Sequence, residues 1–217
     1  MKTGKSVWWV GLLLVLVFAV GCAGIPVRDA VKVDMKLPVG NVEGNQFTGI
    51  RFPFKVAAPP GWQVSTQYPK FMIEQGYDKE GLEASQVFVF NPVTQSNLQI
   101  DFEAADRYNV FDQRSIERLT TAAMGSFQEE LEKELGKGAK TSTVGPTEPV
   151  SLKGVQYAAK KYAIYPAKGI RRNQGWIYAF SEPYQIFILY LIVEKEGTND
   201  LEALKAILDS FEYVPKK

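Results

Sequence analysis

The sequence predicts an α+β fold, with one largely antiparallel β-sheet and helices packed on both of its faces. Strand-like and helical segments follow one another in the order strands, helix, strands, helix, which lacks the regular β-α-β alternation of a doubly wound parallel sheet. Asn97–Ala105 also alternates apolar and polar side chains, which is typical of an antiparallel strand with one solvated face.

The first 22 residues predict where the protein is located. Lys2 and Lys5 precede Val7–Val20, an apolar run of about 14 residues. A membrane span needs about 20 residues, so this run fits the hydrophobic region of a signal peptide. The small residues that precede Cys22 resemble the lipobox of bacterial lipoproteins, in which the cysteine is acylated and the leader is removed before it. The alternatives are an ordinary secretory signal with an incidental cysteine, or an uncleaved anchor.

Cys22 favours the lipoprotein interpretation because it is the only cysteine of the chain and directly follows the apolar run. A lone free thiol is unusual in an exported protein. Two or three acyl chains hold a protein firmly, since each buried CH₂ contributes about 0.8 kcal/mol. Ala23 stands where Asp would signal retention in an inner membrane. We therefore expect a lipoprotein of the outer membrane that faces the periplasm, if the host has two membranes.

Length and charge indicate one globular domain behind a tether. We expect a signal peptide over 1–21, the lipidated cysteine and a tether over 22–46, and one domain over 47–217. The leader holds two of the 25 Lys and Arg, which leaves 23 against 24 Asp and Glu. This near-neutral balance gives no electrostatic reason to expect nucleic acid as a partner.

The first half of the domain predicts four strands and a helix. Strands are expected over Ile50–Val56, Trp62–Thr66, Ser85–Asn91 and Asn97–Ala105, with Pro53 marking an edge or a bulge. A helix is expected from Gln113 to Leu135, with Asp112 as N-cap and Gly136 as C-cap. Its apolar stripe, at three- and four-residue spacing, comprises Ile116, Leu119, Ala123, Phe127, Leu131 and Leu135.

The second half predicts further strands and a closing helix. Strands are expected within Thr141–Val150, over Val155–Tyr165 and over Gly175–Phe180, with a basic loop over Lys168–Asn173. The run Ile186–Val193 is apolar throughout, which predicts a strand covered on both faces. The last helix should span Thr198–Phe211, where Asn199 and Glu202 resemble a capping box.

This order of elements resembles a known family. The stretch Phe52–Trp62 (FPFKVAAPPGW), the turn in Leu152–Ala158 and the closing Asp209–Phe211 look like the PsbP-like and Mog-type fold, which small bacterial lipoproteins of the DcrB type share. The resemblance covers about Phe47–Val214. It implies an α/β/α sandwich used in accessory, assembly or interaction tasks, usually without catalysis. Some plant members bind metal through His, and this sequence has no His.

The composition excludes several kinds of catalytic site. Without His there is neither a Ser-His-Asp triad nor a His-based metal site, and the only cysteine is expected to carry lipid. We therefore predict no enzyme activity, no cofactor and no metal. Carboxylates remain as candidates: Asp101, Glu103 and Asp106 are either a hydrolytic group or the solvated face of a strand, and the second interpretation is favoured.

Basic and aromatic residues supply the candidate contact surface. Tyr165, Lys168, Arg171, Arg172 and Trp176 are predicted to contact a partner, since Arg and aromatic side chains are enriched at interface hot spots.

Two further groups of residues have more than one interpretation. Lys160 with Lys161, and Arg171 with Arg172, could touch anionic lipid or a cell-wall polymer, although such charges more often serve solubility. Aromatic residues could line a groove, although core or rim positions are favoured for them: Tyr162, Tyr165, Trp176, Tyr178 and Tyr184.

Three functions follow from these features. The leading one is a lipid-anchored, non-catalytic envelope protein that binds a protein partner or aids its assembly. The second is a binding module for a small apolar or lipid-like ligand, which requires an apolar cavity. The third is a hydrolase that uses carboxylates alone, which requires a cleft with two carboxylates about 5 to 9.5 Å apart.

Overall fold

The computed structural model describes residues 27–77 and 86–215. The predicted signal peptide and Cys22 lie outside these residues. The chain forms two compact units: residues 27–30 with Asp106–Val110, and Val31–Ala105 with Phe111 onward. In the part of the chain that the structure covers, no helix has the length and apolar character needed to cross a membrane.

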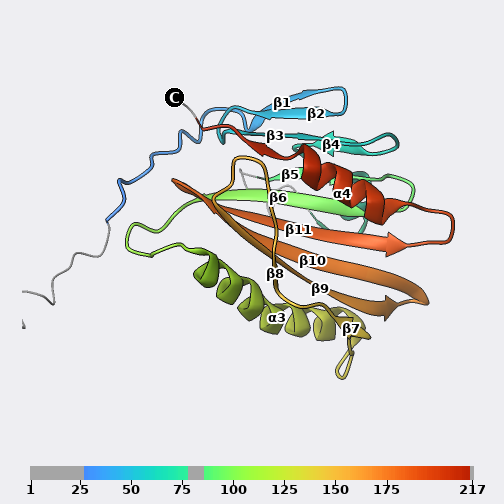
Figure 1. Ribbon diagram of the computed structural model, residues 1–217. Coiled ribbons are helices and arrows are strands. Elements are labelled where there is room, and N and C mark those ends of the chain that lie inside the picture. Colours follow the sequence, from blue (N-terminus) through green and yellow to red (C-terminus); the bar gives the residue numbers. More distant parts are fainter. Residues whose placement is uncertain (1–26, 78–85, 216–217) are drawn as a thin grey trace, which may run out of the picture. The chain divides into compact units, whose positions relative to one another are not determined.

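The large sheet is antiparallel throughout, as the sequence predicted (Figure 1). Its order is β4-β5-β6-β11-β10-β9-β7, and β8 also pairs with β9. The strands are β4 (Gln63–Ser65), β5 (Val87–Phe90), β6 (Asn97–Ala104), β7 (Thr143–Val144), β8 (Glu148–Pro149), β9 (Tyr157–Ala167), β10 (Ile170–Ser181) and β11 (Tyr184–Glu194).

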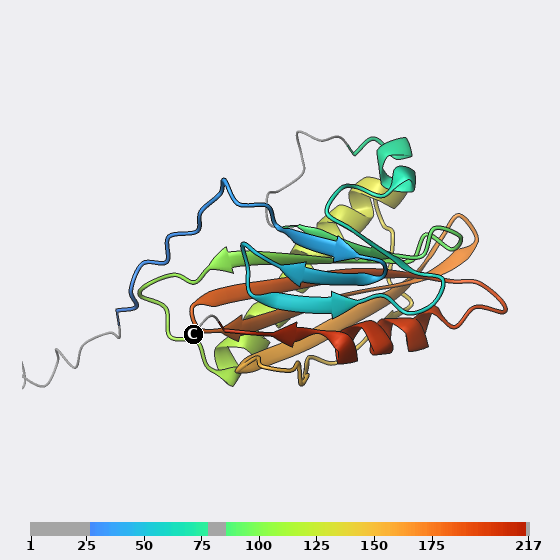
Figure 2. The same cartoon turned by 90° about the horizontal axis from the view of Figure 1, so that it is seen from above.

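A second, smaller sheet lies on one face of the large one (Figure 2). Its strands, in spatial order, are β1 (Gly40–Glu43), β2 (Gln46–Gly49), β3 (Phe54–Ala57) and β12 (Glu212–Tyr213). The sequence predicted one sheet instead of two. These strands have only two to four residues, which is too short for an alternating pattern to stand out.

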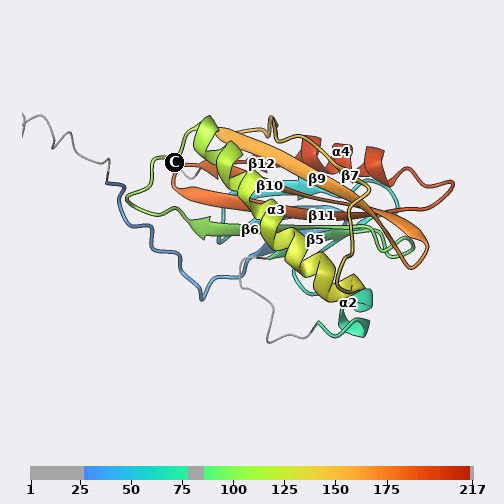
Figure 3. The ribbon, with the colours of Figure 1, turned by 90° about the horizontal axis from the view of Figure 1, so that it is seen from below.

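Helices cover both faces of the large sheet, which confirms the predicted α+β class. Helix α3 (Gln113–Leu135) lies along β9 and β10, and the short α2 (Lys70–Glu74) packs on β5 on the same side (Figure 3). Helix α4 (Asp200–Ser210) packs against β3 and β11 on the opposite side, beside the small sheet.

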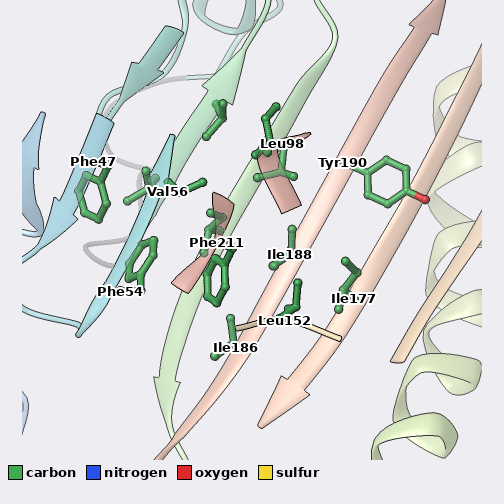
Figure 4. Close-up of a cluster of buried hydrophobic side chains, with 14 of the residues drawn as sticks. Phe47, Phe54, Val56, Leu98, Leu152, Ile177, Ile186, Ile188, Tyr190 and Phe211 are labelled. Atoms are coloured by element: carbon green, nitrogen blue, oxygen red, sulfur yellow. The ribbon is translucent and has the colours of Figure 1, made fainter. Parts of the chain in front are cut away.

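The main core fills the space between the two sheets. Phe54 of β3 stacks on Phe102 of β6 and on Phe211 after α4, with ring centroids 4.6 Å and 5.7 Å apart. Figure 4 shows Phe54 and Phe211 beside Ile186 and Ile188 of β11. Burial of these apolar side chains holds the small sheet and α4 on the large sheet.

Strand β11 is central, between β6 and β10, but it is fully buried on one face only. Ile186, Ile188 and Ile192 face the main core and are completely buried. Phe187 and Leu189 point to the other face and are half-buried. The prediction of full burial on both faces was therefore wrong, because α3 lies along β9 and β10 and leaves the outer face of β11 partly exposed.

The domain starts earlier than the predicted residue 47, which falls inside the β1–β2 hairpin. The lead-in is also attached to the domain. The Arg51 guanidinium donates hydrogen bonds to the carbonyls of Met35 and Leu37, and Val33 and Val39 pack against the main core. Much of the expected tether is thus part of the fold. Its mixed polar sequence has no period that could have predicted this.

The predicted N-terminal cap is present at α3 but absent at α4. Asp112 and Ser115 form a reciprocal capping box at α3, with hydrogen bonds of 2.6 and 2.9 Å, and Gly136 follows the helix with φ of 98°. At α4 the Asn199 side chain makes no capping bond. Asp200 is buried there instead, and it accepts a 2.6 Å hydrogen bond from the Ser96 hydroxyl.

Candidate interaction surface

The predicted basic loop over 168–173 is a tight hairpin turn. Strand β9 ends at Ala167 and β10 begins at Ile170. Only Lys168 and Gly169 connect the two strands, and both residues have a positive φ. Because the strands pair along their whole length, alternate residues around the turn point to opposite faces of the sheet. This alternation separates the five predicted contact residues.

Tyr165 and Trp176 do not reach the surface, so their predicted role in partner contact was wrong. They lie beneath α3, packed against Phe127, with exposed fractions of 1% and 2%. The Tyr165 hydroxyl donates to the Gln174 side chain at 2.7 Å, and burial raises the pKa of Tyr165. The sequence placed both residues in strands that flank the basic loop, but it could not show that their side chains face helix α3.

The two arginines are both ion-paired. Arg172 lies on the face of α3 and contacts Glu134 at 2.7 Å, with its side chain largely buried. Arg171 lies on the other face and contacts Glu194 of β11 at 2.8 Å, and it remains 61% exposed. Arg172 therefore joins a helix to the sheet, whereas Arg171 is available at the surface.

The exposed side chains around this turn include Lys168, Ile170 and Arg171. We call these residues the hairpin tip. Two cations flank an exposed apolar side chain on a rigid two-stranded turn. Arg171 is the member of this group whose residue type is enriched at interface hot spots, so the hairpin tip is the candidate protein-contact surface.

Lys160 and Lys161 hold the chain between β7 and β8 against the sheet. Lys160 pairs with Glu148 at 3.0 Å, and the Lys161 ammonium donates to the carbonyl of Gly145 at 3.0 Å. The ammonium groups of both lysines thus have partners within the fold. This favours a structural role over the binding of an anionic polymer.

The three candidate carboxylates do not lie on one element: two are on strand β6 and one is in the loop that follows it. Asp101 and Glu103 lie on the outer face of β6, where Glu103 is exposed and the Asp101 side chain accepts from the Phe102 N–H at 2.8 Å. Asp106 lies in the other unit, where its carboxylate accepts from two backbone N–H groups. This arrangement favours the solvated strand face over the hydrolytic group.

The remaining aromatic candidates pack against the fold. Tyr184 contacts the rings of Phe52 and Phe102, Tyr178 contacts Phe187, and both are half-buried. Tyr162 covers Gly145 so closely that a Cβ added there would meet its ring at 2.2 Å. These positions match the core-and-rim interpretation.

Two features near the surface were missed in the sequence. A shallow depression, open to solvent, lies between α3 and the chain before β8, and its lining is Arg114, Glu117, Arg118, Thr121, Ala122 and Thr147. The Oδ1 atom of Asn173 is buried without a hydrogen-bond partner among the described residues. Within those residues no group of three acidic or cysteine side chains is placed to hold a metal ion.

No protein-family model matches the sequence, and no curated protein matches it. The fold is similar to that of a protein from Bacteroides thetaiotaomicron VPI-5482 (TM-score 0.45, 12% identity), over 81% of this chain and 50% of that one. This chain thus spans half the length of the Bacteroides protein.

Two further solved structures are similar over most of their length. One is LpqN, involved in cell envelope biogenesis of Mycobacterium tuberculosis (TM-score 0.47, 13% identity, 79% of this chain and 86% of that one). The other is cyanobacterial PsbP (CyanoP) from Synechocystis sp. PCC 6803 (TM-score 0.44, 10% identity, 87% and 99%). At such low identities and TM-scores these similarities concern the fold alone. Membership of the DcrB-type lipoproteins stays a prediction.

Proposed function

We propose that the protein is a non-catalytic lipoprotein of the cell envelope, anchored through acylated Cys22, that binds a protein partner or aids its assembly. The observation that carries the proposal is the leader: a basic start, an apolar run over Val7–Val20, small residues, and the only cysteine of the chain. In a host with two membranes, the predicted location is the outer membrane, facing the periplasm.

A binding role is favoured over turnover by the residues available. A catalyst at neutral pH needs a group that exchanges protons there, and the chain has no His. The polar side chains considered as candidates mostly have structural partners: Arg172 pairs with Glu134, and Tyr165 with Gln174. The proposed partner surface is the hairpin tip of Lys168, Ile170 and Arg171. Tyr165, Arg172 and Trp176, which the sequence also suggested, are left out of it.

Cys22→Ser tests the anchor. Acylation requires the thiol, so this variant should appear as an unprocessed or soluble exported form, whereas the parent should be found in the membrane fraction. Mass measurement of the N-terminus of the natively expressed parent should show acylated Cys22. An unmodified Cys22 in the mature parent would refute the lipoprotein proposal.

A charge reversal tests the partner surface. Lys168→Glu combined with Arg171→Glu should weaken crosslinking to the envelope partner in intact cells and leave the melting temperature nearly unchanged, since exposed ion pairs contribute about 0 to 1 kcal/mol. Lys70→Glu on α2, whose side chain is 91% exposed, is the matched control. Equal crosslinking by all three proteins would exclude the hairpin tip.

A further inference from the structure

Residues 27–30 form a compact unit with the 106–110 loop, the connection between β6 and α3. The backbone N–H of Arg28 donates to the carbonyl of Arg107 at 3.0 Å. In return, Nε of Arg107 donates to the carbonyl of Arg28 at 2.9 Å. The segment that leads away from Cys22 is therefore attached to this loop.

The loop itself has a defined shape. The Asp106 carboxylate accepts hydrogen bonds from the backbone N–H groups of Tyr108 and Asn109, at 2.8 and 3.1 Å, which is the pattern of an Asx turn. The Arg28 guanidinium donates to the carbonyl of Asp106 at 3.2 Å and to that of Asn109. Arg28 thus bonds to both ends of the turn and fixes the lead-in to it.

This loop exposes two large hydrophobic side chains. Tyr108 is 59% exposed and Val110 is 57% exposed. Tyrosine is enriched at membrane–water interfaces, because its ring is apolar and its polar hydroxyl can stay hydrated. Arg28 and Arg107 bring two positive charges, but Asp29 and Asp106 balance them. Any attraction to a bilayer must therefore come from the apolar contact and from the tether rather than from net charge.

The length of chain between the loop and the anchor is short. Arg28 stands six positions after Cys22. Six residues span at most about 20 to 22 Å when fully extended. The polar headgroup region on one side of a bilayer is about 5 to 8 Å thick. An acylated Cys22 would thus hold the 106–110 loop within a short distance of the membrane surface.

We infer that the 106–110 loop lies against the phospholipid surface and that Tyr108 and Val110 enter the interface. This inference rests on the proposed acylation of Cys22. The 106–110 part of the β6–α3 connection would then face the bilayer. Arg28 links the anchor to that loop.

Fluorescence quenching in vesicles tests the inference. Acylation consumes the only native thiol, so Tyr108→Cys supplies one free thiol for an environment-sensitive dye on the full acylated protein. The vesicles contain phosphatidylethanolamine, phosphatidylglycerol and a nitroxide-labelled lipid. Quenching at position 108 should be about threefold stronger than at Val93→Cys, a turn position that is 80% exposed, since the tethered 106–110 loop is held at headgroup level.

A second variant isolates the role of Arg28. Arg28→Ala should reduce quenching at position 108 to the level of position 93, while mass spectrometry still shows acylated Cys22. An acylated protein with equal quenching at both positions would overturn the inference and leave the lipoprotein proposal standing. An unacylated Cys22 would overturn both. Unchanged quenching in Arg28→Ala would overturn the linking role of Arg28.

Discussion

The indole N–H of Trp176 on β10 donates a 2.7 Å hydrogen bond to the backbone carbonyl of Thr120 in the middle of α3. Both residues are buried, and the Thr120 hydroxyl bonds back to the carbonyl of Ile116 at 2.8 Å. A residue that the sequence placed at a contact surface thus joins the long helix to the sheet.

Trp176→Phe should destabilise the protein through a lost hydrogen bond and a smaller ring. Trp62→Phe is the matched control, because Trp62 is 3% exposed and its indole makes no hydrogen bond within the described part of the chain. The free energy of unfolding in urea should fall about 1 kcal/mol further for Trp176→Phe than for Trp62→Phe. Equal losses would show that the bond to Thr120 adds nothing to stability.

The two faces of β11 should tolerate charge differently. Ile188→Asp places an unpaired carboxylate in the main core and should cost several kcal/mol, about half or more of a total stability of roughly 5 to 15 kcal/mol. Leu189→Asp, on the half-buried face, should cost less than half as much, because water reaches that side. Thermal melting of both variants checks this order, and the reverse order would contradict the observed burial.

Stability should decline at high pH through Tyr213. Burial, followed by the nearby Tyr184 and Glu182, raises the pKa of Tyr213 from 10 to about 12. Its hydroxyl donates to the carbonyl of Glu182 at 3.0 Å. In the unfolded chain the phenol loses its proton near pH 10, whereas the folded chain retains it. The Tyr213 contribution is therefore complete below about pH 10 and is lost as the pH rises through about 12.

Tyr213→Phe measures this contribution. The difference between parent and variant at pH 7 gives the cost of the lost hydrogen bond. That difference should shrink between about pH 10 and pH 12 in urea titrations, because the variant has no proton to lose at this position. A difference that stays constant over this range would mean that Tyr213 does not contribute to the alkaline loss.

Asp200 should be needed for the docking of α4. Its carboxylate accepts from Ser96 at 2.6 Å and from the Asn91 side chain at 3.2 Å, and Ser96 accepts from the N–H of Val193. Asp200→Ala should cost about 1 to 3 kcal/mol, since it leaves buried donors without an acceptor. The exposed Asp209→Ala is the control and should cost little. Equal urea midpoints for the two variants would refute this role.

Long periodic segments were predicted well. The helix Gln113–Leu135 has the predicted bounds, and β5, β6 and β11 lie where the apolar runs and alternation placed them. Within α3, however, Leu119 of the predicted stripe is 41% exposed and Thr120 is buried instead. The small Thr120 fits closely beneath Trp176 and Ala159. A pattern of apolar residues cannot predict such a fit, because it depends on the partner strand.

The amino-acid sequence by itself determined the α+β class, the long elements and the chemistry that is missing from the composition, since these depend on local periodicity and residue counts. Only the tertiary structure decided which side of the sheet each residue of the β9–β10 hairpin faces, and so buried Tyr165 and Trp176 but left Lys168 and Arg171 exposed. It also decided that the lead-in is bonded to the fold, as Arg51 shows. Both outcomes depend on contacts between segments far apart in the chain, which no local pattern records.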